Sequence, residues 1–182
     1  MKNFDVIVIG GGAAGMMAAG RAAERGKSVL LLEKNKTLGK KLSITGGGRC
    51  NITNAEFDPH ILLKHYGTAA SFLYSSFSQF GVQDTFDFFQ SHGLPLVVQE
   101  GKRAFPKTER ASDVRDVLET YVRNMGVLIK TGVRISDIIT TGRTVTGVMA
   151  QGIQYYAGAV IIASGGMSHP ETGSSGDGFE WL

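Results

Sequence analysis

A glycine-rich turn between two apolar segments constrains this chain more than any other feature of its sequence. Residues 4–9 (FDVIVI) are short and β-branched, which predicts a buried strand. Residues 13–25 are rich in alanine and methionine and predict a helix that ends at Gly26. Residues 28–33 (SVLLLE) predict a second buried strand. A strand, a helix and a strand in so short a span form a βαβ unit, whose two strands must be parallel.

The turn itself fits the pattern G-x-G-x-x-G in the context that dinucleotide binding requires. Gly10 permits the tight turn, Gly12 lets the backbone approach a pyrophosphate, and Gly15 lets the helix and the strand pack closely. The helix N-terminus supplies unpaired N–H groups for the phosphates. Glu33 ends the second strand and would accept hydrogen bonds from ribose hydroxyls, which favours FAD or NAD over NADP. A glycine turn that serves packing alone is the less favoured alternative.

Three consecutive glycines in residues 45–54 (TGGGRCNITN) raise the question of what lies so close to bare backbone. We expect this backbone to lie against an extended cofactor, with Arg49 and Asn51 donating to its polar groups. The segment follows a basic run, because five lysines or arginines and no acid lie between Lys34 and Arg49. Such a run indicates a polyanion, either a cofactor pyrophosphate or an RNA backbone. A solvated loop and a turn used only for packing stay open as alternatives.

The rest of the chain predicts further helices and strands. Six phenylalanines lie at helical spacing in residues 59–92, and a helical core face accounts for them better than an aromatic binding site does. A further helix is predicted at residues 111–124. Strands are predicted at residues 95–99, 103–105, 127–130 and 159–163, the first two as a pair. A small antiparallel meander is predicted from residues 133–140, 144–150 and 153–156.

Composition limits the class of protein. The 182 residues are 42% hydrophobic and 19% charged, with a net charge of +3, which is ordinary for one globular domain with a sizeable core. A single cysteine excludes an internal disulfide and an internal redox pair. No apolar run approaches the roughly 20 residues that cross a bilayer. We therefore expect a cytoplasmic protein with no membrane partner.

Four stretches resemble one family over essentially the whole chain: GGGAAG, LLEKN, LGKKLSITGGGRCNITN and AVIIASGGMSHPETGSSGDG. They are similar to the BaiN/RdsA-like FAD-dependent oxidoreductases, once called YhiN-like flavoproteins. The second and third glycine clusters are far more specific to that family than the first. The resemblance implies an α/β fold, namely an FAD-binding Rossmann-like domain of glutathione-reductase type. Such a domain has a parallel sheet, crossover helices and a three-stranded antiparallel meander.

The resemblance also implies which residues hold the FAD. The ADP half would be held by Gly10, Gly12, Ala13, Ala14, Gly15, Glu33 and Lys34. The pyrophosphate, ribityl chain and flavin would be followed by Lys41, Thr45, Gly46, Gly47, Gly48, Arg49, Cys50 and Asn51. Adenine would meet the backbone of Val133, and the family's strand-end Ala-Thr-Gly is matched by Ala163, Ser164 and Gly165. The family's Gly-Arg-x-Phe-Pro element is one residue longer here, at residues 101–106, so we assign it no role.

Family members are about twice as long as this chain. The resemblance therefore implies that residues 1–182 form an FAD-binding domain with a helical insertion at about residues 55–95. A substrate domain and a C-terminal FAD segment of the family would be absent. A sheet deprived of its returning segment exposes an edge and an apolar face, so we expect self-association.

No side chain is assigned a catalytic role, and no metal is expected. Cys50 fits a small buried residue better than a nucleophile. The histidines lack metal-ligand spacing, and among them only His169 lies beside an expected flavin loop. Arg49 is a candidate to stabilise reduced flavin, or alternatively a phosphate or carboxylate partner.

Two functions stay open. The first is a flavoenzyme, or the flavin half of one, with NAD(P)H as donor. The resemblance implies a uridine in ribosomal RNA, a steroid enone or an aminoketone as its substrate. The second is an FAD-binding module that turns over only with its missing half or a partner, or a nonfunctional remnant.

Overall fold

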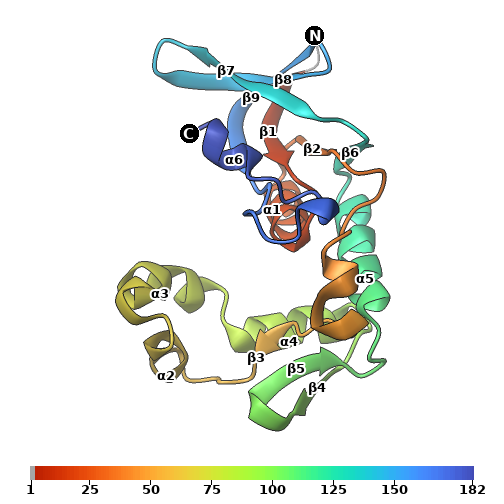
Figure 1. Cartoon of the computed structure of the whole chain (residues 1–182), viewed down its shortest axis with the longest axis vertical. Coiled ribbons are helices and arrows are strands. Elements are labelled where there is room, and N and C mark those ends of the chain that lie inside the picture. The colour runs from red at the N-terminus through yellow and green to blue at the C-terminus, as the bar shows by residue number, and fades with distance from the viewer. Residues whose placement is uncertain (1–2) are drawn as a thin grey trace. The chain divides into compact units, whose positions relative to one another are not determined.

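The computed structural model describes residues 3–182 and divides them into two compact units (Figure 1). The first unit contains the chain up to Leu42 together with Leu118–Leu182, and the second contains Ser43–Val117. The second unit is therefore one continuous excursion of the chain out of the first. Within residues 3–182, no helix is long and apolar enough to cross a membrane.

The first unit is built on a six-stranded mixed sheet in the order β6-β2-β1-β9-β8-β7. Its strands are β1 (Asn3–Ile9), β2 (Val29–Glu33), β6 (Leu128–Thr131), β7 (Ile135–Thr141), β8 (Thr144–Ala150) and β9 (Ile153–Ile162). The first four strands in that order pair in parallel, and β8 and β7 continue from β9 as an antiparallel meander. These pairings confirm the predicted α/β class with a parallel sheet and a three-stranded meander.

One strand differs from its prediction. Residues 153–156 and 159–163 are predicted as separate strands, but they belong to a single strand, β9. The small residues Ala157 and Gly158 interrupt the apolar pattern, but the strand continues through them, and pairing with β1 resumes at Ala159. Tyr156 lies at the crossing point, since it pairs with Asn3 of β1 and with Gly147 of β8. The meander and the parallel sheet therefore share β9 as a common strand.

The core of the first unit lies on both faces of the parallel strands. On one face, a cluster of buried residues joins the sheet to the meander: Ile7, Ile9, Leu30, Leu32, Ile135, Val148 and Ala150. The helix α1 (Ala13–Glu24) buries Gly15, Met16, Ala19 and Gly20. It ends as predicted, because Gly26 follows with a φ of +74°. The helix α5 (Ala111–Asn124) supplies Tyr121, whose ring packs against Gly20.

The rest of the first unit is its C-terminal segment. It contains a short 3₁₀ turn at Pro170–Thr172 and the helix α6 (Asp177–Glu180). Trp181, directly after α6, packs against the buried cluster of the sheet.

The second unit pairs helices with a small sheet. The helices are α2 (Pro59–Lys64), α3 (Ala70–Gln79) and α4 (Val82–Ser91), and the sheet has the order β3-β5-β4. Its strands are β3 (Thr53–Asn54), β4 (Leu96–Gln99) and β5 (Arg103–Pro106). The predicted pairing of β4 with β5 is confirmed, with Val97 opposite Phe105. The strand β3 is too short to leave a pattern in the sequence.

The aromatic residues of the second unit do not form the predicted core face. Of the six phenylalanines, only Phe89 is buried, whereas Phe72 is 83% exposed. The helix α3 has no buried residue at all. Asp58 caps α2 through its side chain, and α2 and α3 pack on each other. No strand of the second unit lies close along α3, so its aromatic stripe has no sheet to cover.

We predict that Gly20→Ala destabilises the first unit. A Cβ at Gly20 would lie 2.0 Å from Tyr121 Cε1, well inside van der Waals contact. The alanine gains about 1 kcal/mol of helix propensity. The forced movement of a fully buried ring costs about 1–3 kcal/mol, so the clash outweighs the gain. Urea denaturation measures the loss, and adding Tyr121→Leu should reverse part of it. An unchanged or raised free energy of unfolding in Gly20→Ala would contradict the packing.

Candidate cofactor site

Two glycines of the first turn hold three segments of the first unit together. Gly10 has a φ of +104°, and a Cβ there would lie 2.4 Å from the carbonyl oxygen of Ala163. A Cβ at Gly15 would lie 1.8 Å from the carbonyl oxygen of Gly10. The end of β1, the first turn of α1 and the end of β9 therefore touch through main-chain atoms. This is the close packing that the sequence pattern predicts for Gly15.

Gly12 differs from its neighbours because the space beside it is open. It is the N-cap of α1, in extended backbone, and no side chain caps the helix there. A Cβ at Gly12 would meet nothing within 4 Å. The first intrahelical bond runs from Met16 N–H to Gly12 O, so the N–H groups of Ala13, Ala14 and Gly15 have no carbonyl partner within the helix. The positive end of α1 thus faces a space that the described chain leaves open.

The Glu33 carboxylate ties the glycine turn to the end of β2. Its Oε2 accepts the Gly11 N–H at 2.6 Å, and its Oε1 accepts the backbone and side-chain N–H groups of Asn35, each at 2.7 Å. The side chain is buried. A carboxylate offers about four acceptor positions, and three are used here. One acceptor position therefore remains for a hydroxyl group.

Lys34 is engaged by the C-terminal segment. Its Nζ lies 2.7 Å from Asp177 Oδ2 and donates to Ser175 Oγ at 2.5 Å. Arg134 lies 3.8 Å from the other carboxylate oxygen of Asp177. The hydrogen bond from Lys34 lowers the pKa of Asp177, although partial burial opposes the shift. A single carboxylate thus serves two cations at the end of the sheet.

Two more lysines and an asparagine hold residues 168–177, which we call the clamp segment. Lys40 donates to Glu171 O at 2.6 Å, and Lys41 donates to Ser168 O at 2.7 Å. Asn35 Nδ2 donates to the carbonyl of Thr172 at 2.9 Å. The predicted cofactor lysines Lys34 and Lys41 therefore bind the protein's own chain in this structure.

The remaining predicted residues of the first unit lie at the same end of the sheet. The Val133 N–H donates to the Glu33 carbonyl at 2.9 Å, which places Val133 beside the end of β2. Ala163 and Ser164 lie against Gly10. Gly165 has a φ of +79°, and a Cβ there would lie 2.7 Å from Ser174 Oγ. The first unit thus brings together its predicted residues: Gly10, Gly12, Ala13, Ala14, Gly15, Glu33, Lys34, Lys41, Val133, Ala163, Ser164 and Gly165.

The three glycines after Thr45 lie in the second unit and all have left-handed backbone. Their φ values are +58° at Gly46, +66° at Gly47 and +83° at Gly48. A Cβ at Gly46 would lie 2.9 Å from the Asn51 backbone nitrogen, whereas nothing lies within 4 Å of a Cβ at Gly47 or Gly48. The first glycine therefore packs inside the loop, and the other two present bare backbone to open space.

The residues that follow these glycines are fixed by their own unit. The Arg49 guanidinium lies 4.5 Å from the centre of the Phe105 ring and 3.5 Å from Glu109 Oε1. Cys50 is 2% exposed. Burial raises the pKa of its thiol, although a hydrogen bond with Thr45 acts in the opposite direction. The burial agrees with the prediction of a small packed residue. The side-chain amide of Asn51 is oriented with its nitrogen toward two backbone carbonyls. In this orientation it donates to Ala104 O at 3.3 Å and to Thr53 O at 3.2 Å.

His169 has a local partner rather than a place in a catalytic arrangement. Its Nδ1 lies 3.0 Å from Glu171 Oε1, and both side chains are exposed. Its φ of +54° is left-handed. The histidine thus starts the short 3₁₀ turn of the clamp segment.

Sequence reasoning missed the partners in the clamp segment. Asn35, Ser168, Glu171, Thr172 and Asp177 all contact the predicted cofactor loop, and none is among the predicted site residues. The stretches LLEKN and GGMSHPETGSSGDG contain them, so the family motifs marked these positions. No pattern in one sequence shows that two motifs more than a hundred residues apart bind each other.

We predict that Gly15→Ala and Gly12→Ala differ in their effect on folding. The Cβ at Gly15 would strike the Gly10 carbonyl, and main chain cannot yield as a flexible side chain does. We expect a loss of at least about 2 kcal/mol in the free energy of unfolding. Position 12 has open space and backbone dihedrals that alanine can adopt, so Gly12→Ala should change the free energy of unfolding by less than about 1 kcal/mol. Denaturant titration compares the pair, and equal losses would contradict the assignment of open space to Gly12.

We predict that Asp177→Asn loosens the clamp segment at neutral pH. The pKa of Asp177 is lowered, so its ion pair stabilises the folded state above the unfolded value of about 3.9 and is lost as pH falls through the folded value. Wild-type protection of residues 168–177 from amide exchange should therefore fall only below about pH 4. The variant should lack that protection at pH 7. Glu180→Gln, which removes a nearby carboxylate, is the control and should leave it intact. Full protection in Asp177→Asn would contradict the clamp.

Two curated proteins are similar to this chain over nearly its full length. The 3-dehydro-bile acid delta(4,6)-reductase of Clostridium scindens is 35% identical over 94% of this chain and 41% of its own length. The ribosomal RNA dihydrouridine synthase of Escherichia coli is 30% identical over 99% of this chain and 44% of its own length. The chain thus spans less than half the length of these relatives.

A solved structure of low sequence identity shows the same fold. The 3-ketosteroid delta1-dehydrogenase of Sterolibacterium denitrificans superposes with a TM-score of 0.73 at 18% identity, over 92% of this chain and 48% of that one. The family model described as the HI0933-like protein Rossmann domain matches residues 4–182. These matches confirm the predicted resemblance, and the chain belongs to the HI0933-like Rossmann-domain family, with BaiN-type and RdsA-type proteins among its relatives.

Proposed function

We propose that this chain binds FAD through its first unit and serves an oxidoreductase as its flavin-binding part. The observation that carries the proposal is the open space at Gly12, where the uncapped end of α1 presents its N–H groups. A pyrophosphate matches that positive, donor-rich position. The relatives add support, because another similar protein, from Monascus ruber, is named an FAD-dependent oxidoreductase and is 38% identical over 52% of this chain.

Glu33 favours a nucleotide with a free ribose diol. Its remaining acceptor position would receive one ribose hydroxyl, while its other positions keep the bonds to Gly11 and Asn35. A 2′-phosphate there would place negative charge beside a buried carboxylate, which is unfavourable. FAD therefore fits this end of the sheet better than NADP as the resident nucleotide.

Thr45 to Asn51 stay a prediction as the residues that follow the flavin half. The open backbone at Gly47 and Gly48 supports it, because a Cβ at either position would meet no protein atom within 4 Å. Arg49 is less suited to that role, since Phe105 and Glu109 already hold its guanidinium.

The names of the relatives support one reaction class. A bile acid delta(4,6)-reductase and a dihydrouridine synthase both saturate a carbon–carbon double bond, and both bonds are conjugated to a carbonyl. Bound FAD supplies two-electron hydride transfer. We propose the reduction of a conjugated enone or of a uridine ring, with NAD(P)H as donor; oxidation of an aminoketone by O₂ is the third candidate. This chain's residues would bind and orient the nucleotide.

A cofactor-binding module without turnover is the second candidate. The observation that favours it is the length of the relatives, of which this chain spans 41–44%. In that case the chain would need a partner or further polypeptide to act on a substrate.

We predict that the purified chain is yellow and that Gly12→Val weakens its binding of FAD at least about tenfold. The valine would fill the open space at the N-terminus of α1, where the phosphates are expected. Quenching of flavin fluorescence during titration gives the dissociation constant. Ala23→Val, at the other end of the same helix, is the matched control and should bind FAD like the wild type. A colourless wild type that leaves FAD fluorescence unquenched would refute the proposal.

The same preparation separates the two candidate functions. Under anaerobic conditions NADH or NADPH is added, and bleaching of the flavin shows that the chain accepts a donor. A steroid enone or a uridine-containing RNA is then added to the reduced protein. Return of the oxidised spectrum identifies an enzyme and its substrate class. An aminoketone is tested instead by its ability to bleach the flavin. Binding of FAD without any of these changes identifies a module.

A further inference from the structure

Asn35 bonds to three segments of the first unit at the carboxyl end of β2. Its backbone N–H and its Nδ2 both donate to Glu33 Oε1, each at 2.7 Å. Nδ2 also donates to Thr172 O of the clamp segment at 2.9 Å, so both hydrogens of the amide are used. The Asn35 carbonyl accepts the Gly132 N–H, from the turn before β7, at 2.8 Å. The position of this residue is therefore fixed from several sides.

The two bonds from Asn35 fill one oxygen of the Glu33 carboxylate. A carboxylate oxygen has two lone pairs, and those of Oε1 are both directed to Asn35. Within residues 3–182, Oε2 accepts only the Gly11 N–H, at 2.6 Å. A Cβ at Gly11 would lie 3.2 Å from Oε2, so the glycine turn packs against this oxygen. The remaining acceptor position of Glu33 is therefore on Oε2, beside the glycine turn.

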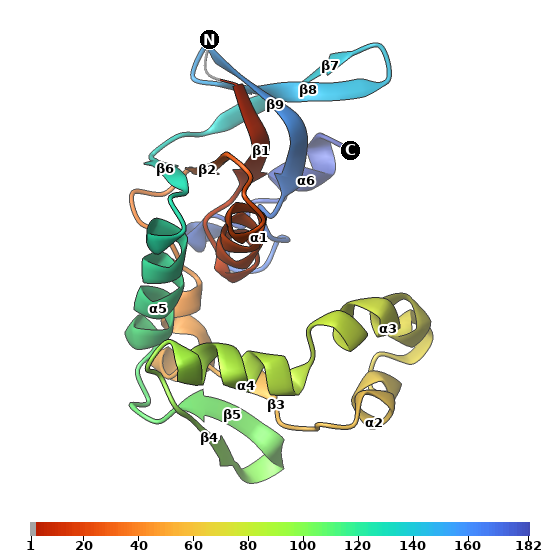
Figure 2. The same cartoon turned by 180° about the vertical axis from the view of Figure 1, so that it is seen from behind.

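Gly173 lets the clamp segment lie directly on Asn35. Its φ is +108°, and a Cβ there would lie 2.6 Å from Asn35 Nδ2 and 3.3 Å from Lys34 Cε. Thr172, whose carbonyl accepts from Asn35, is 6% exposed. The clamp segment belongs to the blue C-terminal part of the chain, which lies beside α1 both in Figure 1 and, from behind, in Figure 2. Asn35 thus links the Glu33 carboxylate to a buried part of the clamp segment.

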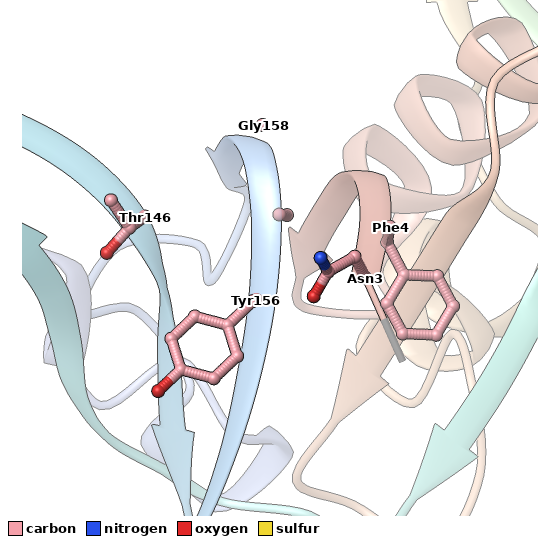
Figure 3. A pocket seen from close by; sticks show the side chains of 6 residues that line it. Asn3, Phe4, Thr146, Tyr156 and Gly158 are labelled. Carbon is pink, nitrogen blue, oxygen red and sulfur yellow. The ribbon is translucent and has the colours of Figure 1, made fainter. Parts of the chain in front are cut away.

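A hollow at the opposite end of the sheet offers no comparable group. It has a volume of about 410 Å³ and is lined by Asn3, Phe4, Thr146, Tyr156, Ala157 and Gly158 (Figure 3). None of these side chains is charged. The hollow lies at the amino end of β1, whereas nucleotides bind open α/β sheets at the carboxyl ends of the strands. The end that Asn35 organises is therefore the one suited to a nucleotide.

We infer that Asn35 is a positioning residue for the nucleotide, an inference that rests on the proposed binding of FAD. It fills Oε1 of Glu33, so the ribose donates one hydroxyl to Oε2. It also ties the same carboxylate to Thr172, so binding of the ribose and ordering of the clamp segment stabilise each other. Both donors of Asn35 are engaged within the protein, and the residue therefore acts through Glu33.

An isosteric variant separates this role from simple fastening of a loop. Asn35→Asp keeps the shape of the side chain but turns an oxygen toward Glu33 Oε1 in place of the N–H group. Two carboxylates that share one site repel each other, and the pKa of one of them is raised. Once the pair takes up a proton, residue 35 again donates to Glu33. The binding defect of Asn35→Asp should therefore shrink as the pH falls.

Titration with FAD, followed by flavin fluorescence, measures this effect. We expect Asn35→Ala to weaken FAD binding at least about tenfold at both pH 8 and pH 5. Asn35→Asp should bind more weakly than Asn35→Ala at pH 8 and more tightly at pH 5. Each dissociation constant is divided by the wild-type value at the same pH, which removes the titration of shared groups such as Lys34 and Asp177. Thr37→Ala, at an exposed position, is the control and should bind like the wild type.

Two results of this titration would overturn the inference. The first is FAD binding of wild-type strength in Asn35→Ala. The second is a binding defect of Asn35→Asp that does not change with pH, because it would show that the side chain only fills space. Circular dichroism verifies that each variant folds. If Asn35→Ala does not fold, the pH dependence of Asn35→Asp decides.

Deoxynucleotides test the single acceptor position on the wild type. Titration calorimetry compares ADP with 2′-deoxy-ADP and 3′-deoxy-ADP. We expect one deoxynucleotide to bind at least about fivefold more weakly than ADP and the other to bind like ADP. Weaker binding of both, or of neither, would overturn the assignment of one hydroxyl to Oε2.

ADP also separates this inference from the proposed function. A wild type that binds ADP but not FAD refutes FAD as the cofactor, and the Asn35 variants are then compared with ADP by the same criteria. A wild type that binds FAD as well as its Asn35 variants do refutes the role of Asn35 alone. A wild type that binds neither nucleotide refutes both.

Amide exchange tests the link to the clamp segment. The Thr172 and Gly173 amides should exchange more slowly in the wild type when FAD is saturating. In Asn35→Ala without ligand they should exchange faster than in the wild type, and saturating FAD should slow them less. Exchange at these amides that neither FAD nor the substitution changes would overturn the coupling between the ribose carboxylate and the clamp segment.

Discussion

The Glu33 carboxylate is the interaction on which the cofactor end of the first unit depends. Three N–H groups converge on it, one from the glycine turn and two from Asn35. The bond to Gly11 fixes the turn above the end of β2, and the bonds to Asn35 fix the chain that leaves β2. Because Asn35 also donates to Thr172, the same carboxylate is linked to the clamp segment. A buried charge is acceptable here only because hydrogen-bond donors surround it.

The lysines of the basic run bind the clamp segment even without a ligand. Three lysines that the sequence offers to a polyanion donate to the clamp segment, and only Lys34 meets a carboxylate. The other two meet carbonyl oxygens, which leaves most of their charge uncompensated. An arriving pyrophosphate would find a loop already ordered by main-chain contacts and still positive. The run is thus a loop bound to the clamp segment, and binding of a polyanion by its lysines stays a proposal.

Local patterns predicted the elements of the first unit because each was strong. The β-branched runs at β1 and β2, the alanine-rich α1 and the turn at Gly26 all agree with the structure. Prediction failed where the structure of a segment depends on other segments that pack or pair with it. Phe77 and Phe80 lie three residues apart, which is helical spacing, but a stripe becomes a core face only when another element packs on it. The continuity of β9 likewise depends on β1 and β8, which no window around Gly158 contains.

The glycines show the same limit at atomic scale. Gly10, Gly12 and Gly15 belong to one motif, yet Gly10 and Gly15 touch main chain while Gly12 faces open space. Gly46 packs inside its loop, whereas Gly47 and Gly48 do not. A glycine packed against backbone serves the fold, whereas the open space beside a glycine has room for a ligand or only for solvent. Spacing alone cannot separate these two kinds of glycine, because one motif contains both. Within the two motifs, a Cβ would meet nothing within 4 Å at Gly12, Gly47 and Gly48. Turn glycines such as Gly26 and Gly126 have the same open surroundings, so the open space at Gly12 is informative because it lies beside the uncapped N-terminus of α1.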